Sequence, residues 1–181
     1  MIFHATPIPG ARLVDLELRS DERGFFARAW CRDEFARAGL DPRLEQANVA
    51  WNRSRGTVRG LHYQRPPHGE AKLVRCLGGA AFFALVDLRR ASPAFARPWT
   101  VTLAAAETTQ LYVPEGVALG YQTLADATEL FYLMSASYRP ESAAGIRYDD
   151  PRLAIAWPAA ATVVSERDRA LPAFDPERCG I

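Results

Sequence analysis

The hydrophobic residues of the chain occur mainly in short runs that turn-forming residues interrupt. Five of these runs alternate or are rich in β-branched and aromatic residues, and we predict a strand in each: 72–77, 81–88, 99–103, 110–113 and 129–134. Glycine, proline and aspartate separate the runs. No amphipathic helix of useful length lies between them, which argues against parallel βαβ units. Many short strands at close spacing predict a sandwich or a barrel.

The first 45 residues mix strand, turn and helix signals. Residues 12–18 alternate well enough for a first strand. Residues 21–24 have turn chemistry, and the aromatic stretch 25–30 is expected to resume as a strand. Residues 33–38 predict a short helix, because an aspartate stands near its start and a glycine follows its end. The chain from residue 165 onward is expected to be irregular or briefly helical.

Composition narrows the class of protein. The chain has 181 residues, of which 49% are apolar and 24% charged, so we expect one globular all-β domain over residues 1–181 with short peripheral helices. The net charge is +1 with both signs interspersed, which argues against nucleic-acid and membrane partners. The three cysteines are far apart and form no zinc motif. No signal peptide and no long apolar run are evident, so a reduced, cytoplasmic protein is expected.

Residues 59–64 gather a cation, a glycine, an imidazole, a phenol and an amide within six positions. Two interpretations fit this cluster: the polar mouth of a ligand site, or a strand edge whose histidine bonds a backbone carbonyl. Two segments resemble the two signature motifs of a cupin jelly roll: residues 60–64 with the following Glu70, and residues 114–119. Metal-binding cupins place histidines where this chain has Gln64 and Leu119. The cupin resemblance therefore implies a metal-free site, since nitrogen ligands for a transition metal are missing.

Over nearly its full length the chain resembles the dTDP-4-dehydrorhamnose 3,5-epimerase family. The similar segments keep the family's order, and they are 21–26, 46–48, 58–64, 72–76, 86–93, 114–116, 120–124, 149–151, 157–158 and 165–168. Each segment is weak alone, and their joint order makes the resemblance specific. It implies a cupin-type double-stranded β-helix, or jelly roll. It also implies a cofactor-independent isomerase that epimerises a nucleotide-linked 4-keto-6-deoxy sugar in the biosynthesis of rhamnose and related deoxysugars.

Epimerisation next to a ketone needs a base, a group that stabilises the enolate oxygen, and an acid on the opposite face. No redox cofactor is needed, because the ketone already acidifies the neighbouring C–H bonds. His62 suits the base, and the resemblance implies Asp168 as its partner, Tyr132 as the acid and Lys72 beside the enolate oxygen. From the residues alone, other interpretations stay open. Asp168 fits a helix capping box over 165–168, Tyr132 fits a core position, and Lys72 fits a solvated strand edge.

The resemblance also implies a set of substrate-binding residues. Guanidinium groups suit the diphosphate, amides suit the base or sugar, and aromatic rings suit stacking and lining. The residues that carry these roles are Arg23, Phe26, Gln46, Asn48, Arg59 and Tyr138. Family members complete this part of the site with a partner chain, and their jelly rolls pair by exchanging N-terminal strands. A homodimer is therefore expected.

Three positions depart from the family pattern. Leu119 stands where a histidine is usual, Arg28 where a glutamate is usual, and Ala143 where an acidic residue is common. The proposed base, acid and lysine remain, so the implied chemistry is intact while the nucleotide stays open. One alternative is an epimerase restricted to C3 or C5 that acts on a GDP- or CDP-linked sugar. Another is a non-catalytic cupin that binds a sugar nucleotide.

Overall fold

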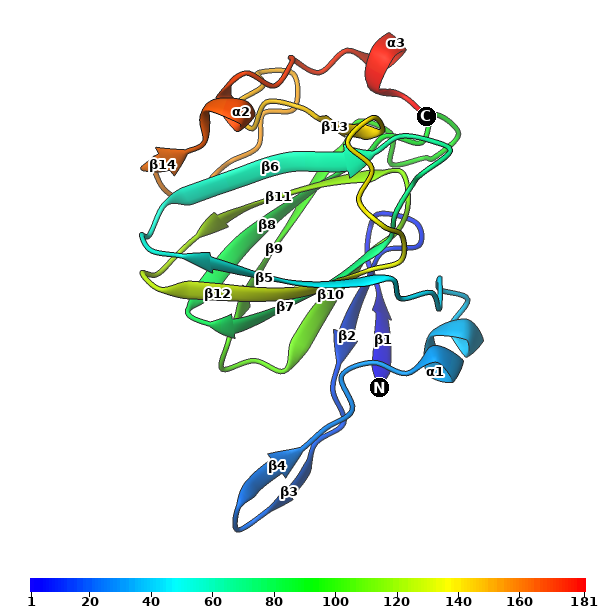
Figure 1. Cartoon of the computed structure of the whole chain (residues 1–181), viewed down its shortest axis with the longest axis vertical. Coiled ribbons are helices and arrows are strands. Elements are labelled where there is room, and N and C mark those ends of the chain that lie inside the picture. Colours follow the sequence, from blue (N-terminus) through cyan, green and yellow to red (C-terminus); the bar gives the residue numbers. More distant parts are fainter.

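Two β-sheets face each other in the computed structural model, which describes residues 1–181 (Figure 1). In spatial order the first sheet contains β1 (Ile2–Ala5), β2 (Arg12–Asp15), β10 (Thr109–Val113), β7 (Lys72–Gly78), β12 (Thr128–Met134) and β5 (Gln46–Asn52). The second contains β13 (Ala143–Gly145), β6 (Thr57–Gln64), β11 (Val117–Thr123), β8 (Ala80–Asp87) and β9 (Pro98–Ala104), and β14 (Val163–Val164) pairs with β6 in parallel. Strands distant in sequence thus lie side by side, as the predicted jelly roll requires.

The five strands predicted after residue 46 are confirmed, and each boundary differs by at most one residue. β11 has no predicted counterpart among them. Every residue of β11 is buried, because the strand lies between β6 and β8 and is covered on both faces. A strand buried on both faces need not alternate between apolar and polar residues. Its sequence therefore carries no period of two.

The N-terminal strands are shorter than predicted. β2 ends at Asp15 rather than residue 18, because Asp15 pairs with the first residues of both neighbouring strands, Ile2 and Thr109. Residues after Asp15 have no residue of β1 or β10 opposite them with which to form strand hydrogen bonds. The predicted strand 25–30 is also too long: β4 covers Gly24–Phe26, and its partner β3 covers Arg19–Asp21. These two strands form a hairpin that projects away from both sheets (Figure 1).

Three short helices decorate the sheets: α1 (Arg32–Arg37), α2 (Glu166–Arg169) and α3 (Pro176–Cys179). α1 confirms the predicted helix, and Gly39 follows it with a φ of +70°, the left-handed conformation that glycine adopts easily after a helix end. The helical turns α2 and α3 lie in the otherwise irregular C-terminal segment, as expected. None of the helices has the length and apolar character that crossing a membrane would require.

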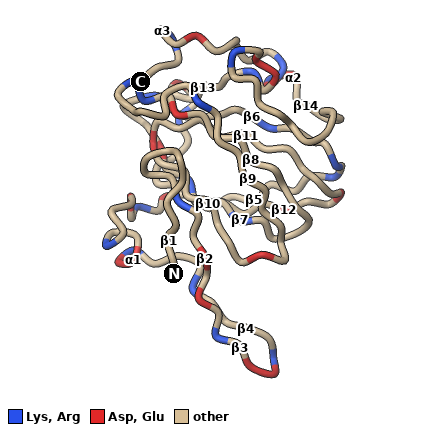
Figure 2. Tube along the Cα trace, turned by 180° about the vertical axis from the view of Figure 1, so that it is seen from behind, with Lys and Arg blue, Asp and Glu red and all other residues tan.

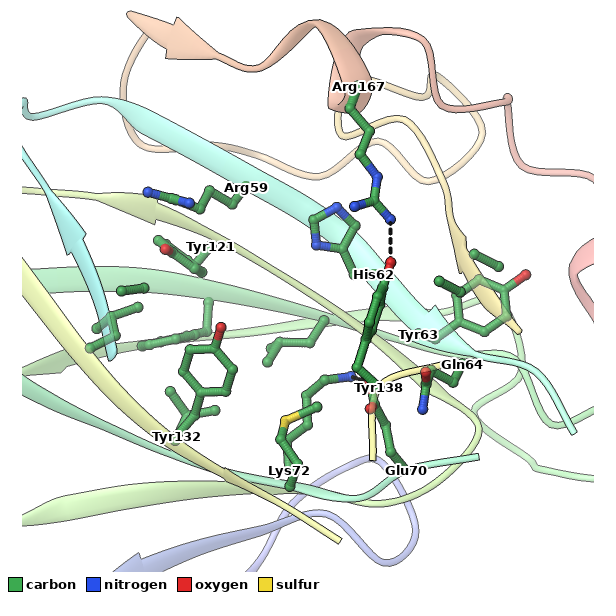
Figure 3. Close-up of a pocket in the computed structure, with 18 residues that line it drawn as sticks. Arg59, His62, Tyr63, Gln64, Glu70, Lys72, Tyr121, Tyr132, Tyr138 and Arg167 are labelled. Atoms are coloured by element: carbon green, nitrogen blue, oxygen red, sulfur yellow. Dashed lines mark hydrogen bonds and ion pairs between the residues drawn. The ribbon is translucent and has the colours of Figure 1, made fainter. Parts of the chain in front are cut away.

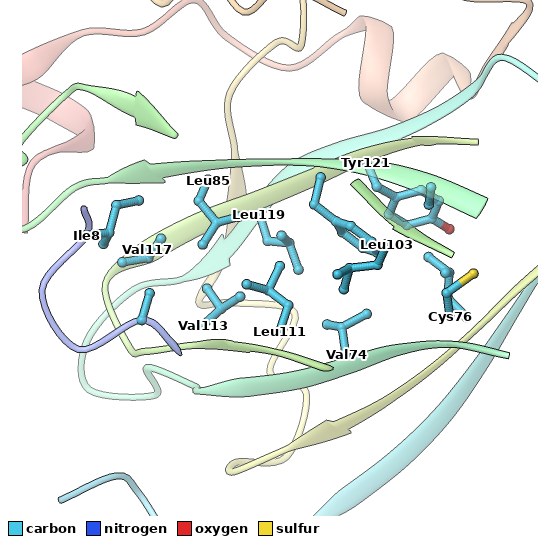
Figure 4. Close-up of a cluster of buried hydrophobic side chains, with 14 of the residues drawn as sticks. Ile8, Val74, Cys76, Leu85, Leu103, Leu111, Val113, Val117, Leu119 and Tyr121 are labelled. Carbon is cyan, nitrogen blue, oxygen red and sulfur yellow. The ribbon is translucent and has the colours of Figure 1, made fainter. Parts of the chain in front are cut away.

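The main core lies between the facing sheets (Figure 4). Inward-facing residues from strands of both sheets fill it, among them Val74 on β7, Leu111 on β10 and Leu85 on β8. Burying each such side chain contributes roughly 1.5–3 kcal/mol. The core occupies one part of the space between the sheets, and the remainder is a pocket.

Two further clusters cover the outer faces. Residues after β13, including Ile146, Leu153 and Phe174, pack on the outer face of the second sheet. On the first sheet, Phe35 of α1 packs against strand residues such as Tyr112. This cover is incomplete, because β5 and β7 leave apolar side chains exposed on the same sheet. Charged residues of both signs are scattered over the trace, the β3–β4 hairpin included (Figure 2).

Candidate active site

A cavity of about 260 Å³ lies between the two sheets beside the core. Strands of both sheets line it, and Figure 3 shows polar side chains entering from opposite sides. The polar and aromatic lining residues are Arg59, His62, Tyr63, Gln64, Glu70, Lys72, Tyr121, Tyr132, Tyr138 and Arg167. Val74, Phe83, Leu119 and Leu130 belong to its apolar lining. A pocket that is largely apolar with a few convergent polar groups is typical of a small-molecule site.

His62 projects into this pocket from β6 and pairs with Asp168. Its Nε2 lies 2.7 Å from Oδ1 of Asp168, whose other oxygen accepts a hydrogen bond of 3.2 Å from the backbone N–H of Gly60. An ionised carboxylate only accepts hydrogen bonds, so Nε2 must donate the proton. The other ring nitrogen, Nδ1, has no hydrogen bond. It is therefore the atom of His62 that is free to take up a proton.

The Asp168 carboxylate is buried but remains ionised. Burial alone would raise its pKa, but the hydrogen bond and charge of His62 and the N–H of Gly60 together outweigh burial. The net result is a pKa below the ordinary value for aspartate. The pair is thus an imidazole held by an ionised carboxylate, the arrangement that orients a general base.

The capping interpretation of residues 165–168 is half right. The Ser165 hydroxyl accepts a hydrogen bond of 3.1 Å from the backbone N–H of Asp168 and caps α2. In a full capping box the Asp168 side chain would return to the Ser165 backbone. It bonds Gly60 and His62 instead. The serine therefore caps the helix, while the carboxylate holds the pocket residue His62.

Lys72 and Tyr132 lie on β7 and β12 of the first sheet, across the pocket from His62 (Figure 3). The Lys72 ammonium is 2.7 Å from Oε1 of Glu70, and both side chains are less than a tenth exposed. Lys72 is thus a buried pocket residue and not a solvated strand-edge lysine. Burial raises the pKa of Tyr132, partly offset by Arg59, and the charge of Glu70 raises it further. The phenol therefore keeps its proton at neutral pH.

Arg59 is held in place by Asn52. The Asn52 side-chain oxygen accepts hydrogen bonds from Arg59 Nε at 3.0 Å and from the Tyr121 hydroxyl at 3.2 Å. Burial raises the pKa of Tyr121 to about 12, so its hydroxyl stays protonated and available as a donor. This network fixes a guanidinium group at the pocket wall, where it suits an anionic group of a ligand.

A second guanidinium group, Arg167, was missed by the sequence prediction. Its Nη2 donates a hydrogen bond of 3.4 Å to the hydroxyl of Tyr138 (Figure 3). Tyr138 is in turn fixed by Gln46, whose side-chain oxygen accepts from the Tyr138 backbone N–H. Arg167 directly precedes Asp168, a predicted site residue, and this position in the sequence is the signal that could have identified it. The pocket thus has an arginine on each side of His62.

The other predicted binding residues fall into two groups. Asn48 is opposite Tyr132 in the β5–β12 register and half-buried, near the pocket but not lining it. Arg23 and Phe26 are on the projecting hairpin, where Arg23 pairs with Asp21 and the Phe26 side chain is 70% exposed. Neither lines the pocket of its own chain. Arg28 also lies elsewhere, in an ion pair of 2.9 Å with Glu34.

Gln64 and Leu119, which stand at cupin histidine positions, have structural contacts. The Gln64 amide donates to the backbone oxygens of His68 and Ser137 and accepts from the N–H of Arg139. Leu119 is opposite His62 in the β6–β11 register and belongs to the main core. No group of three or more His, Cys, Asp or Glu side chains has the arrangement of a metal site.

Comparison with known proteins gives a consistent picture. A family model described as dTDP-4-dehydrorhamnose 3,5-epimerase matches residues 5–176. A dTDP-4-dehydrorhamnose 3,5-epimerase of Sinorhizobium fredii is 36% identical over 175 residues, covering 96% of this chain and 90% of the relative. A dTDP-4-dehydrorhamnose 3-epimerase of Streptomyces niveus is 38% identical over 90% of this chain and 78% of its own length.

Solved structures resemble the chain equally well. The crystal structure of dTDP-4-dehydrorhamnose 3,5-epimerase from Bacillus anthracis, with TDP and PPi bound, superposes with a TM-score of 0.92. The two sequences are 34% identical, and the match covers 96% of this chain and 99% of that one. The similarity therefore extends over the whole sandwich, including the segments that line the pocket.

Proposed function

Because the chain belongs to the dTDP-4-dehydrorhamnose 3,5-epimerase family, we propose that it is an isomerase that epimerises dTDP-4-dehydro-6-deoxyglucose at the carbons flanking its ketone. One observation carries this proposal. His62 on the second sheet, paired with Asp168 of α2, faces Lys72 and Tyr132 on the first sheet across one pocket. A base and an acid on opposite walls match the need to remove a proton from one face and return it to the other.

We assign the proton removal to His62. Its free Nδ1 takes the proton from the carbon next to the ketone, and Asp168 stabilises the imidazolium that forms. The electrons of the broken C–H bond move into an enolate, whose charge rests on the former ketone oxygen. The Lys72 side chain is largely buried, and an ammonium shielded from solvent stabilises such an oxyanion more strongly than in water.

Tyr132 is the proposed acid of the second half of the reaction. Its phenol keeps its proton at neutral pH because burial raises its pKa. Donation of that proton to the opposite face of the enolate inverts the carbon and restores the ketone. These steps exchange protons only, so residues of the chain account for each of them.

The binding residues are assigned by their charge and position. Arg59 and Arg167 suit the diphosphate, since guanidinium groups form paired hydrogen bonds with phosphate oxygens. Tyr138, held by Gln46, offers a ring for the nucleobase, and Asn48 offers an amide at the same end. The TDP-bound relative supports dTDP as the nucleotide, in preference to GDP or CDP.

We also propose a homodimer in which the β3–β4 hairpin of one chain completes the pocket of the other. Arg23 and Phe26 have no pocket contact in their own chain, and Phe26 is largely exposed. The outer face of the first sheet exposes Val49, Trp51 and Leu77, an apolar surface that a second copy would bury. Pairing would also protect the edge strands β1 and β5.

Two further proposals concern the domain organisation and the cellular location of the protein. We propose that residues 1–181 act as one domain, because both terminal segments pack on the outer faces of the same pair of sheets. We propose a reducing, cytoplasmic location, which is supported by three cysteines that are all unpaired.

Exchange in heavy water tests the catalytic proposal. Incubation with dTDP-4-dehydro-6-deoxyglucose should introduce deuterium at both C3 and C5, and NMR measures its incorporation at each carbon. His62→Ala should abolish exchange at both carbons while leaving the far-ultraviolet circular dichroism unchanged. His68→Ala is the matched control, because the His68 side chain does not line the pocket, and it should retain exchange. Exchange that survives in His62→Ala would remove His62 as the base.

Mixing two inactive variants tests the shared site. Arg23→Ala and His62→Ala should each have little activity. In a mixed dimer, one pocket combines the intact His62 of the Arg23→Ala chain with the intact hairpin of the His62→Ala chain. Activity should therefore reappear on mixing under conditions that exchange subunits. If the mixture stays as inactive as its components, Arg23 acts within its own chain.

A further inference from the structure

Glu70 lines the pocket, and the mechanism above leaves one of its oxygens unused. Oε1 is 2.7 Å from the Lys72 ammonium. Oε2 has no hydrogen-bond partner, and it is buried, since the Glu70 side chain is only 6% exposed. Leaving a buried acceptor unpaired costs about 1–3 kcal/mol, and more for a charged group. An unpaired, charged acceptor in a ligand pocket indicates that a ligand supplies its donor.

The neighbouring groups define what that donor is. The Lys72 ammonium donates hydrogen bonds and Glu70 Oε2 accepts them, and the two belong to one ion pair on one wall of the pocket (Figure 3). The complementary ligand presents an acceptor and a donor on adjacent atoms. A ketone flanked by a hydroxyl-bearing carbon, an α-hydroxyketone, is such a group. In the proposed substrate the C4 ketone and the C3 hydroxyl form it.

We propose that Glu70 is a specificity-determining residue that accepts a hydrogen bond from the C3 hydroxyl of the sugar while its other oxygen holds Lys72 against the C4 oxygen. This inference rests on the proposed function, because it takes the ketone position from the Lys72 assignment. It goes further by stating which 4-keto sugars the pocket selects. Those with a free hydroxyl at C3 are bound, and those without one leave a buried carboxylate oxygen unpaired.

A role as a simple counter-ion for Lys72 fits the structure less well. A counter-ion needs one oxygen near the ammonium and has no reason to bury the second without a partner. The Glu70 side chain is as buried as that of Lys72, so water does not freely solvate Oε2. The two roles also differ in their consequences, since a counter-ion treats all ketone substrates alike.

The test compares two substrates with wild-type protein and Glu70→Gln. One substrate is dTDP-4-dehydro-6-deoxyglucose, and the other is its 3-deoxy analogue, in which C5 still flanks the ketone. Deuterium exchange at C5 gives kcat/KM for both. Wild-type protein should prefer the parent by about tenfold to a hundredfold, as expected for a hydrogen bond to a charged acceptor. Glu70→Gln should reduce this preference to about threefold or less.

Controls separate this outcome from a general defect. Glu107→Gln removes the same charge in the exposed turn before β10 and should keep the wild-type preference. In Glu70→Gln both substrates should lose kcat/KM, because Lys72 loses its charged partner, and the parent should lose about tenfold more than the analogue, because only the parent also loses the hydrogen bond from C3. An equal loss for both substrates, or a wild-type protein that does not distinguish them, overturns the proposal. Absence of exchange with the parent in wild-type protein would instead overturn the proposed function.

Discussion

At the scale of single residues, Asp168 links the end of a helix to the pocket histidine. Its backbone N–H is bound by the Ser165 hydroxyl, and its carboxylate is bound by His62 and Gly60. The backbone of Asp168 is therefore fixed from one side and its side chain from the other. Positioning of this kind is what a general base requires, because an imidazole in the wrong tautomer presents N–H where a lone pair is needed.

Asp168→Asn should lower kcat by roughly 10²–10⁴-fold with a smaller change in KM, because an amide no longer enforces the tautomer of His62. The rate of C3 and C5 exchange measures this loss. Ser165→Ala is the companion variant. It should cost about 1 kcal/mol of stability in urea denaturation, as loss of an N-cap does, but retain most of the exchange rate. Equal losses of activity in both variants would make Asp168 structural only.

At the scale of elements, β6 carries His62 and also comes close to the backbone of its neighbour β11. Gly60 has a φ of +101°, and a Cβ at this position would lie 2.6 Å from the backbone oxygen of Leu119 and 2.8 Å from the Cα of Gly120. Both contacts are with the backbone of β11, where the register of the pairing shifts. The absence of a side chain at Gly60 therefore lets β6 approach β11 two residues before His62.

Gly60→Ala should destabilise the protein by about 2–4 kcal/mol, because the added methyl group combines backbone strain with a clash against β11. Urea denaturation measures this change. Gly39→Ala is matched to it, since Gly39 also has a positive φ but nothing within 4 Å of an added Cβ. That variant should cost only about 1 kcal/mol. Similar costs at the two glycines would show that the close approach to β11 is unimportant.

The elements also indicate what sequence patterns can predict. Strands such as β7 and β12 were predicted within one residue, because one face of each packs on the core and leaves a pattern. The length of β2 was not predictable, since it depends on where its partners begin. His62, Lys72 and Tyr132 were identified by family resemblance. The unpaired oxygen of Glu70 and the position of Arg167 depend on tertiary packing, which leaves no periodic signal.

At the scale of the whole molecule, an ion pair between a buried aspartate and a partly exposed arginine joins distant segments around the end of β8. The Asp87 side chain is fully buried and forms hydrogen bonds of 2.8 and 2.6 Å with Nε and Nη2 of Arg89. Arg89 Nη2 also donates to the backbone oxygen of Pro9 at 2.7 Å. Nearby, the N–H of Ile181 bonds the oxygen of Leu88 at 2.7 Å. The N-terminal loop and the C-terminal end thus meet at one place.

Asp87→Asn should destabilise the protein by about 2 kcal/mol or more at pH 7, because it leaves the Arg89 guanidinium without its charged partner. Burial alone would raise the pKa of Asp87, but hydrogen bonds from Arg89 and Ser92 outweigh it and lower the pKa. A lowered folded-state pKa adds stability that is fully present above the unfolded value of about 3.9. That stability is lost as the pH falls below this value through the folded pKa.

Urea denaturation of wild-type protein and Asp87→Asn at several pH values checks this dependence. The difference in unfolding free energy should be constant from pH 7 to about pH 5 and should shrink below about pH 4. A difference that persists unchanged at pH 3 would attribute the effect to packing rather than to the charge of Asp87.

The placement of α2 after both sheets in the chain has a consequence for synthesis. His62, Lys72 and Tyr132 lie on strands that are complete by residue 134, whereas Asp168 belongs to the later segment of the chain, which packs on the outer face of the second sheet. A nascent chain that has emerged only as far as β13 carries His62, Lys72 and Tyr132 without the carboxylate that we propose orients His62. On the proposed mechanism, we therefore expect catalytic competence only late in translation, once the segment that carries Asp168 has folded.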